Sequence, residues 1–296
     1  MLMATYNGVE FVLEQIASIQ GQTHSDFALY IRDDGSSDGT IETCRQAAAR
    51  DNRIKIMHDN HGPSGCAAAN FFLMLRAIDL TEYMFVAFSD QDDIWAPAKL
   101  ARAISCLTEH CAEGYSSDLV AFDNDAGAAW YLKKSDSGRN LDYLFQGASA
   151  GCTYLLSQNA AALVKEKVEL MRGAFPVDRS HDWLIYAVCR SHGLRWFIDS
   201  QSHVFYRQHG HNVYGAMLGA GGFIKKLGLS STGWYRDHVL WNAKFLQRTD
   251  LEQSVLALVQ RMGLIDRIKL VWRANEFRRS KRDRMLLQMA LLLGRF

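Results

Sequence analysis

The sequence has no cysteines at the spacing of a metal or redox motif. No two of its six cysteines form a CxxC pair, and the Cys106/Cys111 pair has no second pair to match it. This pattern argues against a disulfide framework and favours buried, reduced thiols that act as small hydrophobic residues in a cytosolic protein. The cysteines are Cys44, Cys66, Cys106, Cys111, Cys152 and Cys189.

Long apolar runs are also missing. The longest nearly unbroken run, residues 285–293, includes Gln288 and is far too short to cross a bilayer. We find no internal repeat and no low-complexity tract. Residues 1–4 form a strand-like segment that is followed directly by polar residues, so we expect no signal peptide, although this first strand looks clipped by a few residues.

With 296 residues, 48% hydrophobic and 22% charged, the chain suits one large α/β domain with an appendage, or two domains.

Charge is distributed unevenly along the chain. Residues 261–296 contain ten Lys or Arg and three Asp or Glu, a net charge of +7, whereas the rest of the chain carries a net charge of −6. Residues 264–272 combine basic and apolar side chains at helical spacing. A basic amphipathic helix suits an anionic membrane surface, and the alternative is that its apolar side packs on the core or on a second subunit.

The first 110 residues alternate between strand-like and helix-like segments. Strands are expected near residues 2, 29, 55 and 86, and this alternation predicts a parallel, doubly wound sheet with helices on both faces. Beyond residue 110 the alternation blurs, and from about residue 221 the chain is predicted to be helical to its end. The glycine-rich residues 219–222 therefore divide a domain at 1–220 from a helical segment at 221–296. The helices are predicted at 9–20, 41–50, 66–78, 97–108, 159–171 and 179–191, and later strands at 119–122, 194–198 and 203–207.

Three carboxylates follow an apolar run at residues 84–88. Asp90, Asp92 and Asp93 repel one another, so a folded protein needs a cation to compensate them. Hard oxygen ligands at the end of a buried strand suit Mg²⁺ or Mn²⁺ and a phosphate-bearing substrate. The alternative is a solvated acidic turn before a helix. Polar segments at 5–8 and 33–40 also follow strands, and we expect all three segments to meet beyond the carboxyl ends of the sheet.

Five segments resemble the motifs of family 2 glycosyltransferases of the GT-A fold. Their combination is similar to the rhamnosyltransferase-type branch that builds bacterial surface polysaccharides, and the likeness covers about residues 1–215. It implies a GT-A-type, Rossmann-like, mostly parallel sheet with helices on both faces, plus a C-terminal helical appendage. The segments are ATYNG at 4–8, IRDDGSSDGT at 31–40, SDQDDIWAPAKL at 89–100, HDW at 181–183 and YRQHG at 206–210.

The resemblance implies a site for a nucleoside-diphosphate sugar such as a dTDP- or UDP-sugar. A tyrosine can stack on the base, and an aspartate can accept the imide N–H of uracil or thymine. The alternative for residues 33–40 is an Asx-type turn that caps the next helix, and the alternative for Arg207 is an ion pair with a local acid. The implied nucleotide-site residues are Thr5, Tyr6, Asn7, Asp33, Asp34, Asp90 and Arg207.

The resemblance also implies a Mg²⁺ or Mn²⁺ site and a general base. Asp92 or Asp93 takes the metal, and the metal neutralises the departing nucleoside diphosphate. His209 or His211 either completes the metal site or contacts a phosphate, and the alternative for each is a structural histidine that forms only local hydrogen bonds. Asp182 matches the base that deprotonates the acceptor hydroxyl in an inverting transfer. Its alternative is a carboxylate placed to favour a helix dipole. Trp183 beside it either forms an apolar face for a sugar ring or packs in the core.

These features together predict an inverting, metal-dependent glycosyltransferase. The resemblance alone makes L-rhamnose from dTDP-L-rhamnose the first choice of donor sugar, and it implies a lipid-linked or polysaccharide acceptor in O-antigen or capsule synthesis. The expected location is the cytoplasm, at the cytoplasmic face of the inner membrane, with a homodimer as one arrangement and no nucleic-acid partner. A sugar-phosphate nucleotidyltransferase is the alternative, but residues 5–8 lack its basic glycine-rich loop. A further alternative is a non-catalytic saccharide-binding paralogue, and the presence of the three acids and of Asp182 argues against it.

Overall fold

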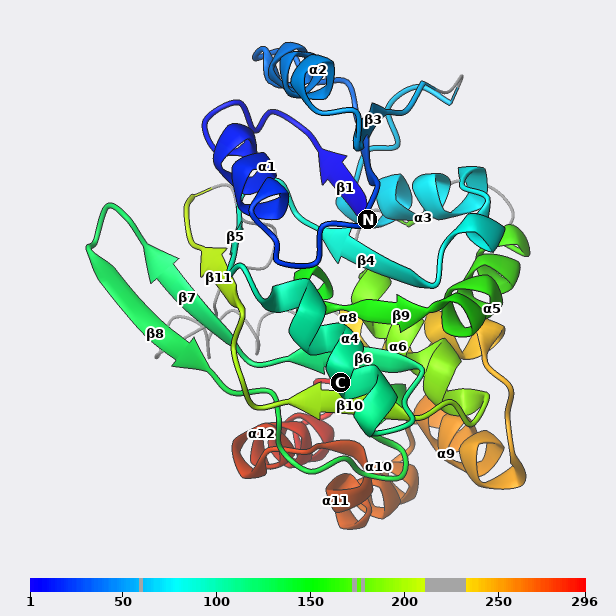
Figure 1. Cartoon of the computed structure of the whole chain (residues 1–296). Coiled ribbons are helices and arrows are strands. Elements are labelled where there is room, and N and C mark those ends of the chain that lie inside the picture. Colours follow the sequence, from blue (N-terminus) through cyan, green and yellow to red (C-terminus); the bar gives the residue numbers. More distant parts are fainter. Residues whose placement is uncertain (59–60, 172–174, 177–178, 211–232) are drawn as a thin grey trace.

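A seven-stranded sheet forms the centre of the molecule (Figure 1), and the computed structural model describes residues 1–58, 61–171, 175–176, 179–210 and 233–296. The strand order is β10-β6-β9-β4-β1-β2-β3, and only β9 runs antiparallel to its neighbours within this sheet. The predicted mostly parallel sheet is confirmed. Its strands are β1 (Leu2–Thr5), β2 (Leu29–Asp33), β3 (Ile54–Ile56), β4 (Phe85–Ser89), β6 (Gly114–Ser117), β9 (Leu155–Ser157) and β10 (Trp196–Asp199).

Helices cover both faces of this sheet, as the sequence predicts. Alternate residues of β4 point to opposite faces, so Val86 and Phe88 lie in one core and Ala87 in the other. Burial on both faces explains why β4 is an unbroken apolar run. One core holds α3 (Ala67–Ala77), α5 (Gln158–Glu169) and α6 (His181–Ser191), and the other holds α1 (Val12–Gln20), α2 (Thr40–Arg50) and α4 (Lys99–Glu109).

A second, four-stranded sheet lies beside the first, at the end where the acidic motif emerges (Figure 1). The sequence predicts two of its strands but treats the residues before α4 as loop, whereas two of them pair with a strand more than 100 residues away. Strands β6, β8 and β9 were likewise not predicted, because they are short and are defined by their pairing rather than by an apolar period. The order is β5 (Ile94–Trp95), β11 (Val204–Arg207), β7 (Leu119–Asp123) and β8 (Ala128–Leu132).

The cysteine prediction needs one correction. All six cysteines are free thiols and four are buried, but Cys111 is exposed and Cys66 is half-buried. Cys66 precedes α3, and its sulfur accepts the Ala69 N–H at 3.4 Å. Its polarity therefore serves as a helix cap, which composition does not reveal.

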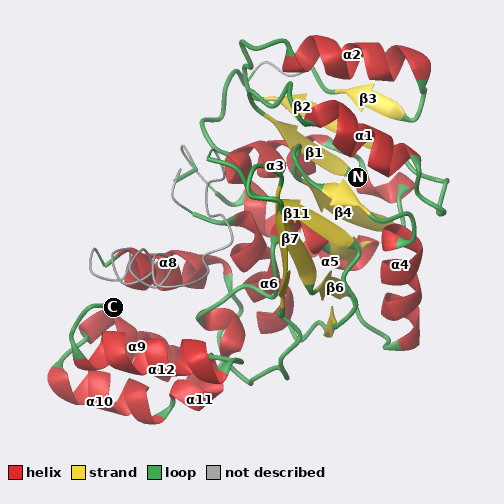
Figure 2. Cartoon of the chain, turned by 90° about the vertical axis from the view of Figure 1, so that its left-hand side faces the viewer, coloured by secondary structure: helices red, strands yellow, loops and turns green. Residues whose placement is uncertain are grey.

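The described residues from 233 onward are mainly helical, as predicted, and they share a core with the sheet. Phe277 stacks on Phe145 with 4.2 Å between ring centroids. Figure 2 shows the last four helices together at one end of the molecule, away from α1 and α2. The predicted boundary at 220 lies outside the described residues. Every helix of the described ranges is too short or too polar to span a bilayer. These C-terminal helices are α8 (Trp234–Asn242), α9 (Asp250–Arg261), α10 (Leu264–Trp272), α11 (Ala274–Phe277) and α12 (Lys281–Leu292).

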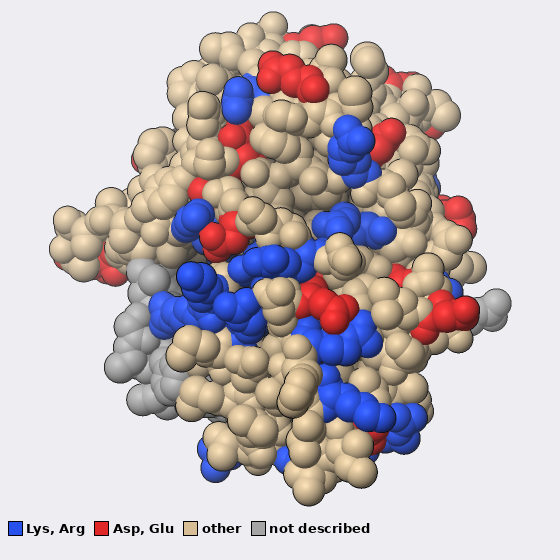
Figure 3. Space-filling view, turned by 90° about the horizontal axis from the view of Figure 1, so that it is seen from below, with Lys and Arg blue, Asp and Glu red and all other residues tan. Residues whose placement is uncertain are grey.

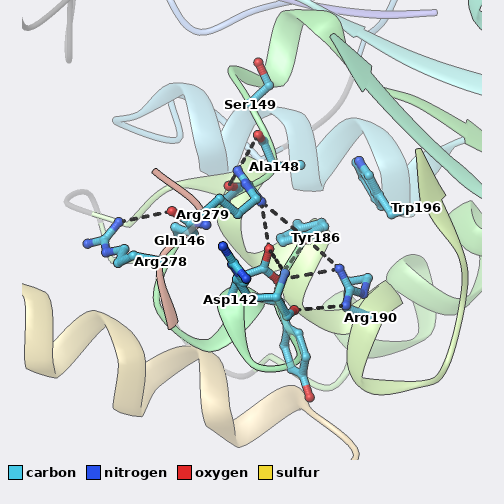
Figure 4. A network of polar contacts seen from close by, with 12 residues as sticks. Asp142, Gln146, Ala148, Ser149, Tyr186, Arg190, Trp196, Arg278 and Arg279 are labelled. Atoms are coloured by element: carbon cyan, nitrogen blue, oxygen red, sulfur yellow. Dashed lines mark hydrogen bonds and ion pairs between the residues drawn. The ribbon is translucent and has the colours of Figure 1, made fainter. Parts of the chain in front are cut away.

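An arginine between α11 and α12 ties these helices to the segment that precedes β9 (Figure 4). Arg279 donates to the Asp142 carboxylate at 3.2 Å and to the carbonyl oxygens of Gly147 and Ala148 at 2.7 Å each. The Asp142 side chain is fully buried, and Tyr186 donates to its other oxygen at 3.0 Å. The C-terminal helices thus position a segment that leads directly to the candidate site.

Candidate functional site

Hydrogen bonds join the loops that follow β1, β2 and β4. The Tyr6 N–H donates to Gln91 Oε1 at 2.8 Å, and Gln91 Nε2 donates back to the Tyr6 carbonyl at 2.9 Å. Asn7 joins the loop after β2 in the same two-way manner, because its N–H donates to Ser36 Oγ at 2.8 Å and its Oδ1 accepts the Ser37 N–H at 2.9 Å. The polar segments therefore meet at one edge of the sheet, as predicted.

The Gln91 side chain passes close to the backbone of Gly8 at this junction. A Cβ atom on Gly8 would lie 2.2 Å from the Gln91 Cδ, so any larger residue displaces the side chain that links the two loops. Asn7 has a φ of 45°, in the left-handed region that asparagine tolerates better than most residues. Sequence reasoning missed Gln91, because a glutamine between two aspartates carries no signal of its partner.

Asp33 closes the turn after β2. Its Oδ2 accepts the N–H groups of Gly35 at 3.1 Å and Ser36 at 2.8 Å, and its Oδ1 accepts the hydroxyl of the buried Thr5 at 3.0 Å. This is the Asx-type arrangement named as the alternative for residues 33–40. In this structure Asp33 and Thr5 therefore stabilise the conformation of the loop.

Asp34 is buried in an ion pair. Its carboxylate lies 2.9 Å from Arg32 Nη1, and it accepts the backbone N–H groups of Ser64 at 2.5 Å and Gly65 at 2.9 Å. Arg32 in turn donates to the Gly62 carbonyl at 2.7 Å. The pair holds the loop before α3 against the site. Arg32 was not predicted, since an arginine inside a short strand gives no indication of where its guanidinium lies.

Asp90, Asp93 and Cys152 form a compact cluster. One ligand atom from each lies within 4.8 Å of the others. Asp93 is fully buried: its Oδ1 accepts the Arg207 N–H at 3.4 Å, and its Oδ2 has no hydrogen-bond partner within the described residues. The sequence marks residues 147–152 as small enough for close approach, but it does not indicate that the thiol at their end meets the acids.

The cluster shifts the pKa of each of its members. Burial, and then repulsion from Asp92 and Asp182, raise the pKa of Asp90 to about 7. Burial and the two neighbouring aspartates hold the pKa of Asp93 well above its usual value. Burial also raises the pKa of the Cys152 thiol, so Cys152 stays protonated at neutral pH. Without a bound cation, this site resists full ionisation.

A buried lysine lies close to these acids. The Lys99 side chain is almost fully buried, its ammonium nitrogen is 3.4 Å from the centroid of the Trp95 ring, and it has no hydrogen-bond partner among the described residues. Burial lowers the pKa of Lys99 to about 7, although the nearby Asp93 acts to raise it. Part of the compensating charge that the acids need thus comes from within the chain.

Asp92, just before β5, contacts His209, just after β11. His209 Nε2 lies 2.8 Å from Asp92 Oδ2, and the imidazole stacks on Phe11 at 4.9 Å between centroids. The Asp92 and His209 side chains keep 14% and 16% of their surface exposed, so they are accessible where Asp93 is not. His211 lies outside the described residues.

Arg207 is paired locally. Its Nη2 donates to Glu14, its Nε donates to the Asp92 carbonyl at 2.9 Å, and its guanidinium lies between the rings of Phe11 and Phe122 at 4.8 and 4.7 Å. The local ion pair that was the alternative for Arg207 is therefore present. Arg207 positions the backbone of the acidic loop.

Asp182 lies at the same end of the sheet as the acidic loop. It is in the first turn of α6, and His181 before it lies 6.0 Å from the ring of Phe88, near the end of β4. Its charge is close enough to raise the pKa of Asp90. The predicted base and the acidic motif are therefore brought together.

The bonds of Asp182 leave one oxygen available. Ser180 Oγ donates to Asp182 Oδ1 at 2.5 Å and the Trp183 N–H donates to the same oxygen at 2.7 Å, while no described residue donates to Oδ2. Trp183 itself is buried, and its indole N–H donates to the Tyr143 carbonyl at 2.9 Å. Trp183 therefore packs in the core, which was one of its two predicted uses.

The donor set fits a divalent cation. The Asp93 Oδ2 is a buried carboxylate oxygen without a hydrogen-bond partner among the described residues, and the Asp93 carboxylate clusters with Asp90. The accessible Asp92–His209 pair adds a carboxylate and an imidazole nearby. Carboxylates suit Mg²⁺, and carboxylates with an imidazole suit Mn²⁺ as well. The protonated Cys152 thiol is a poor ligand for either ion.

Comparison with known proteins gives a consistent result. Residues 1–158 match the model of the family described as glycosyl transferase family 2. The chain is 32% identical over 294 residues to the dTDP-rhamnosyl transferase RfbG of Shigella flexneri, which covers 99% of this chain and 100% of that protein. It is 30% identical over 110 residues to the Escherichia coli UDP-Glc:alpha-D-GlcNAc-diphosphoundecaprenol beta-1,3-glucosyltransferase WfgD, covering 37% of this chain and 41% of that one.

Among solved structures, S. aureus TarS 1-349 in complex with UDP-GlcNAc has the same fold. The TM-score is 0.62 at 16% sequence identity, and the match covers 98% of this chain and 78% of that chain. At this identity the likeness concerns the fold alone, which is the GT-A fold that the sequence motifs imply.

Proposed function

Since this chain belongs to glycosyl transferase family 2, we propose that it transfers L-rhamnose from dTDP-L-rhamnose to a saccharide acceptor with inversion at the anomeric carbon. Family membership makes it a glycosyltransferase. The observation that carries the choice of donor is the similarity to the dTDP-rhamnosyl transferase RfbG over nearly the whole chain. A UDP-sugar is the alternative donor for the same site.

The joined loops form the proposed nucleotide site. The ring of Tyr6 is 58% exposed where these loops meet, so it is available to stack on the base. Asp33 and Asp34 already bond within the loops, so their proposed contribution is to fix the surface against which the base and ribose lie. Asp90 is the carboxylate proposed to face the ribose. The proposed set is Thr5, Tyr6, Asn7, Asp33, Asp34 and Asp90, with Arg207 holding the acidic loop.

Asp92, Asp93 and His209 are proposed to hold Mg²⁺ or Mn²⁺. When bound, the cation supplies positive charge that stabilises the departing nucleoside diphosphate. The accessible Asp92–His209 pair meets the solvent side of this site, and Asp93 meets its buried side. Lys99 adds a further positive charge behind Asp93, although its own pKa is lowered to about 7 by burial.

Asp182 is the proposed general base. Its Oδ2 accepts the proton of the acceptor hydroxyl while the hydroxyl oxygen forms a bond to the anomeric carbon. The bond from that carbon to the diphosphate oxygen breaks in the same step, and the electron pair leaves with dTDP. The two hydrogen bonds to Oδ1 hold the carboxylate so that Oδ2 remains accessible.

The acceptor is proposed to be a lipid-linked saccharide in O-antigen or capsule synthesis. WfgD, a relative over part of the chain, is named for a diphosphoundecaprenol acceptor. A chain that works on such acceptors has to reach the cytoplasmic face of the inner membrane, and we propose that residues 221–296 serve that purpose while residues 1–220 carry the catalytic site. A homodimer remains a prediction.

The test is a screen of sugar nucleotides by thermal shift with and without Mn²⁺. A donor present at about a hundredfold above its Kd adds about 2.7 kcal/mol of stability. We expect dTDP-L-rhamnose with Mn²⁺ to raise the melting temperature more than UDP-glucose does. A larger shift with UDP-glucose would reassign the donor.

Turnover then separates the enzyme classes. The transferase releases dTDP, whereas a nucleotidyltransferase releases pyrophosphate. Asp182→Asn should retain the donor-induced shift and lose activity by about a hundredfold or more, while Glu169→Gln, on an exposed position at the end of α5, should leave both unchanged. Unchanged turnover in Asp182→Asn would remove Asp182 as the base.

A further inference from the structure

Two C-terminal helices turn apolar side chains toward solvent. On α10, Trp272 is 85% exposed and Ile265 is 68% exposed, although Leu270 on the same helix is fully buried. At about 100° per residue, the exposed apolar side chains of α10 fall within one stripe along the helix. A helix on the surface of a globular protein normally turns such a stripe inward. The stripe on α10 consists of Leu264, Ile265, Ile268 and Trp272.

Helix α12 carries a second stripe of the same kind. Leu287 and Leu291 face the core, yet Met285 is 61% exposed and Leu292 is 60% exposed. The first turn of this helix adds the exposed Lys281 and Arg282. The stripe on α12 consists of Met285, Met289, Leu292 and Leu293.

The two stripes lie on the same side of the helix pair. Arg267 donates to the Leu291 carbonyl at 3.5 Å and Gln288 donates to the Val271 carbonyl at 3.2 Å, so α10 and α12 run antiparallel along a common seam. We measure the angle around each helix axis from the seam to the middle of the exposed stripe, in the direction in which the chain winds from N- to C-terminus. At about 100° per residue this angle is about 100° on both helices. Antiparallel packing then places both stripes on one side. We call these eight apolar side chains the α10/α12 face.

Both helices of this face also carry exposed basic side chains. Residues 261–296 contain ten Lys or Arg against three Asp or Glu. Figure 3 shows Lys and Arg side chains gathered across the end of the molecule at which these helices lie. Lys269 on α10, like Lys281 and Arg282 on α12, is exposed. Apolar side chains with a basic rim match a bilayer whose surface is anionic.

We propose that the α10/α12 face docks on an anionic phospholipid membrane, with its apolar side chains in the headgroup region and its basic rim on the lipid phosphates. A second copy of the chain is a poorer partner, because pairing two such faces brings like charges together. The proposal rests on the lipid-linked acceptor proposed above, and it adds which surface of the chain meets the membrane. Its test measures vesicle binding and does not depend on turnover.

The test is flotation of the purified full chain with vesicles of phosphatidylcholine, with and without phosphatidylglycerol. The wild type should float with the anionic vesicles and float weakly with phosphatidylcholine alone. High salt should weaken flotation with the anionic vesicles, because it screens the attraction between the basic side chains and the lipid phosphates. Ile268→Ser with Trp272→Ser should lower partitioning at least tenfold, because two large apolar side chains no longer insert. Leu170→Ser, which alters a 63% exposed leucine after α5, is the matched control.

A charge variant tests the rim separately. Lys281→Glu with Arg282→Glu should weaken binding to anionic vesicles at least tenfold and leave binding to phosphatidylcholine nearly unchanged. Arg45→Glu with Arg50→Glu, two exposed residues of α2, makes the same change in net charge and is the control. All four variants alter exposed residues, so their melting temperatures should match that of the wild type.

Three outcomes would overturn the proposal. These are failure of the wild type to float, equal flotation of the Ile268/Trp272 variant, and a dimer in vesicle-free solution that this variant dissociates, which would assign the face to self-association. The variant should change neither the donor-induced thermal shift nor the rate at which dTDP is released when the sugar is transferred to a soluble acceptor. Failure of donor binding would therefore count against the proposed function alone.

Discussion

Asp90→Asn should stabilise the unliganded protein at neutral pH, although it alters the proposed donor site. Burial and repulsion from Asp92 and Asp182 raise the pKa of Asp90 to about 7. An aspartate in the unfolded chain titrates about three pH units lower, and each unit corresponds to about 1.4 kcal/mol, which gives up to about 4 kcal/mol. Asp90 keeps partial contact with solvent, so we expect a gain of about 2–4 kcal/mol in the free energy of unfolding.

The sign of the pH dependence follows from the direction of this shift. The pKa of Asp90 in the folded state lies above its unfolded value, so between about pH 4 and pH 7 the folded protein binds more protons than the unfolded chain. The wild type therefore loses stability through this carboxyl as the pH rises through that window. Asparagine does not titrate, so the gap between Asp90→Asn and the wild type should be widest above about pH 7 and close toward about pH 4.

Urea unfolding followed by tryptophan fluorescence measures this gap in buffers that contain EDTA. Asp51→Asn is the matched control, because Arg53 and Gln20 lower the pKa of Asp51 and that substitution should reduce stability at neutral pH. Addition of Mn²⁺ should narrow the Asp90→Asn gap, since a cation offsets the repulsion in the wild type. If Asp90→Asn is no more stable than the wild type at about pH 8, or if the gap is the same at about pH 5, the reasoning about this cluster is wrong.

Three further predictions concern the site and its support. Gly8→Ala places a Cβ 2.2 Å from the Gln91 Cδ, so it should displace Gln91 and raise the donor Kd roughly tenfold in calorimetric titrations; an unchanged Kd would show that this link does not shape the site. Arg279→Met should reduce the free energy of unfolding by about 3 kcal/mol in urea titrations, because it removes a partner of the fully buried Asp142; a loss below about 1 kcal/mol would mean that the remaining partners suffice. His238→Phe should increase the free energy of unfolding by about 2 kcal/mol more at about pH 5 than at about pH 8. Burial lowers the pKa of His238 to about 3, so at about pH 5 the imidazole is protonated in the unfolded wild type but not in the folded one, and this difference costs stability that phenylalanine does not lose. Urea titrations at the two pH values test this, and an equal gain at both would contradict it.

The sequence by itself determined the order of strands and helices in the first 110 residues and the position of the acids after β4. Apolar periods and turn residues are local features, so they can be detected without knowledge of the fold. Parallel strands that alternate with helices place their carboxyl ends at one edge, so the meeting of the three polar loops also followed. The basic, apolar character of residues 264–293 was likewise visible, because it is a matter of composition.

Only the tertiary structure decided what each polar side chain contacts. Arg207 bonds to Glu14, 193 positions away along the chain, and Cys152 lies against Asp93. Strand β5 exists because two residues pair with β11. The exposed stripes on α10 and α12 could not be distinguished from core-facing ones in the sequence. In each case the outcome depends on which distant segment occupies the neighbouring space, and local sequence patterns contain no information about that neighbour.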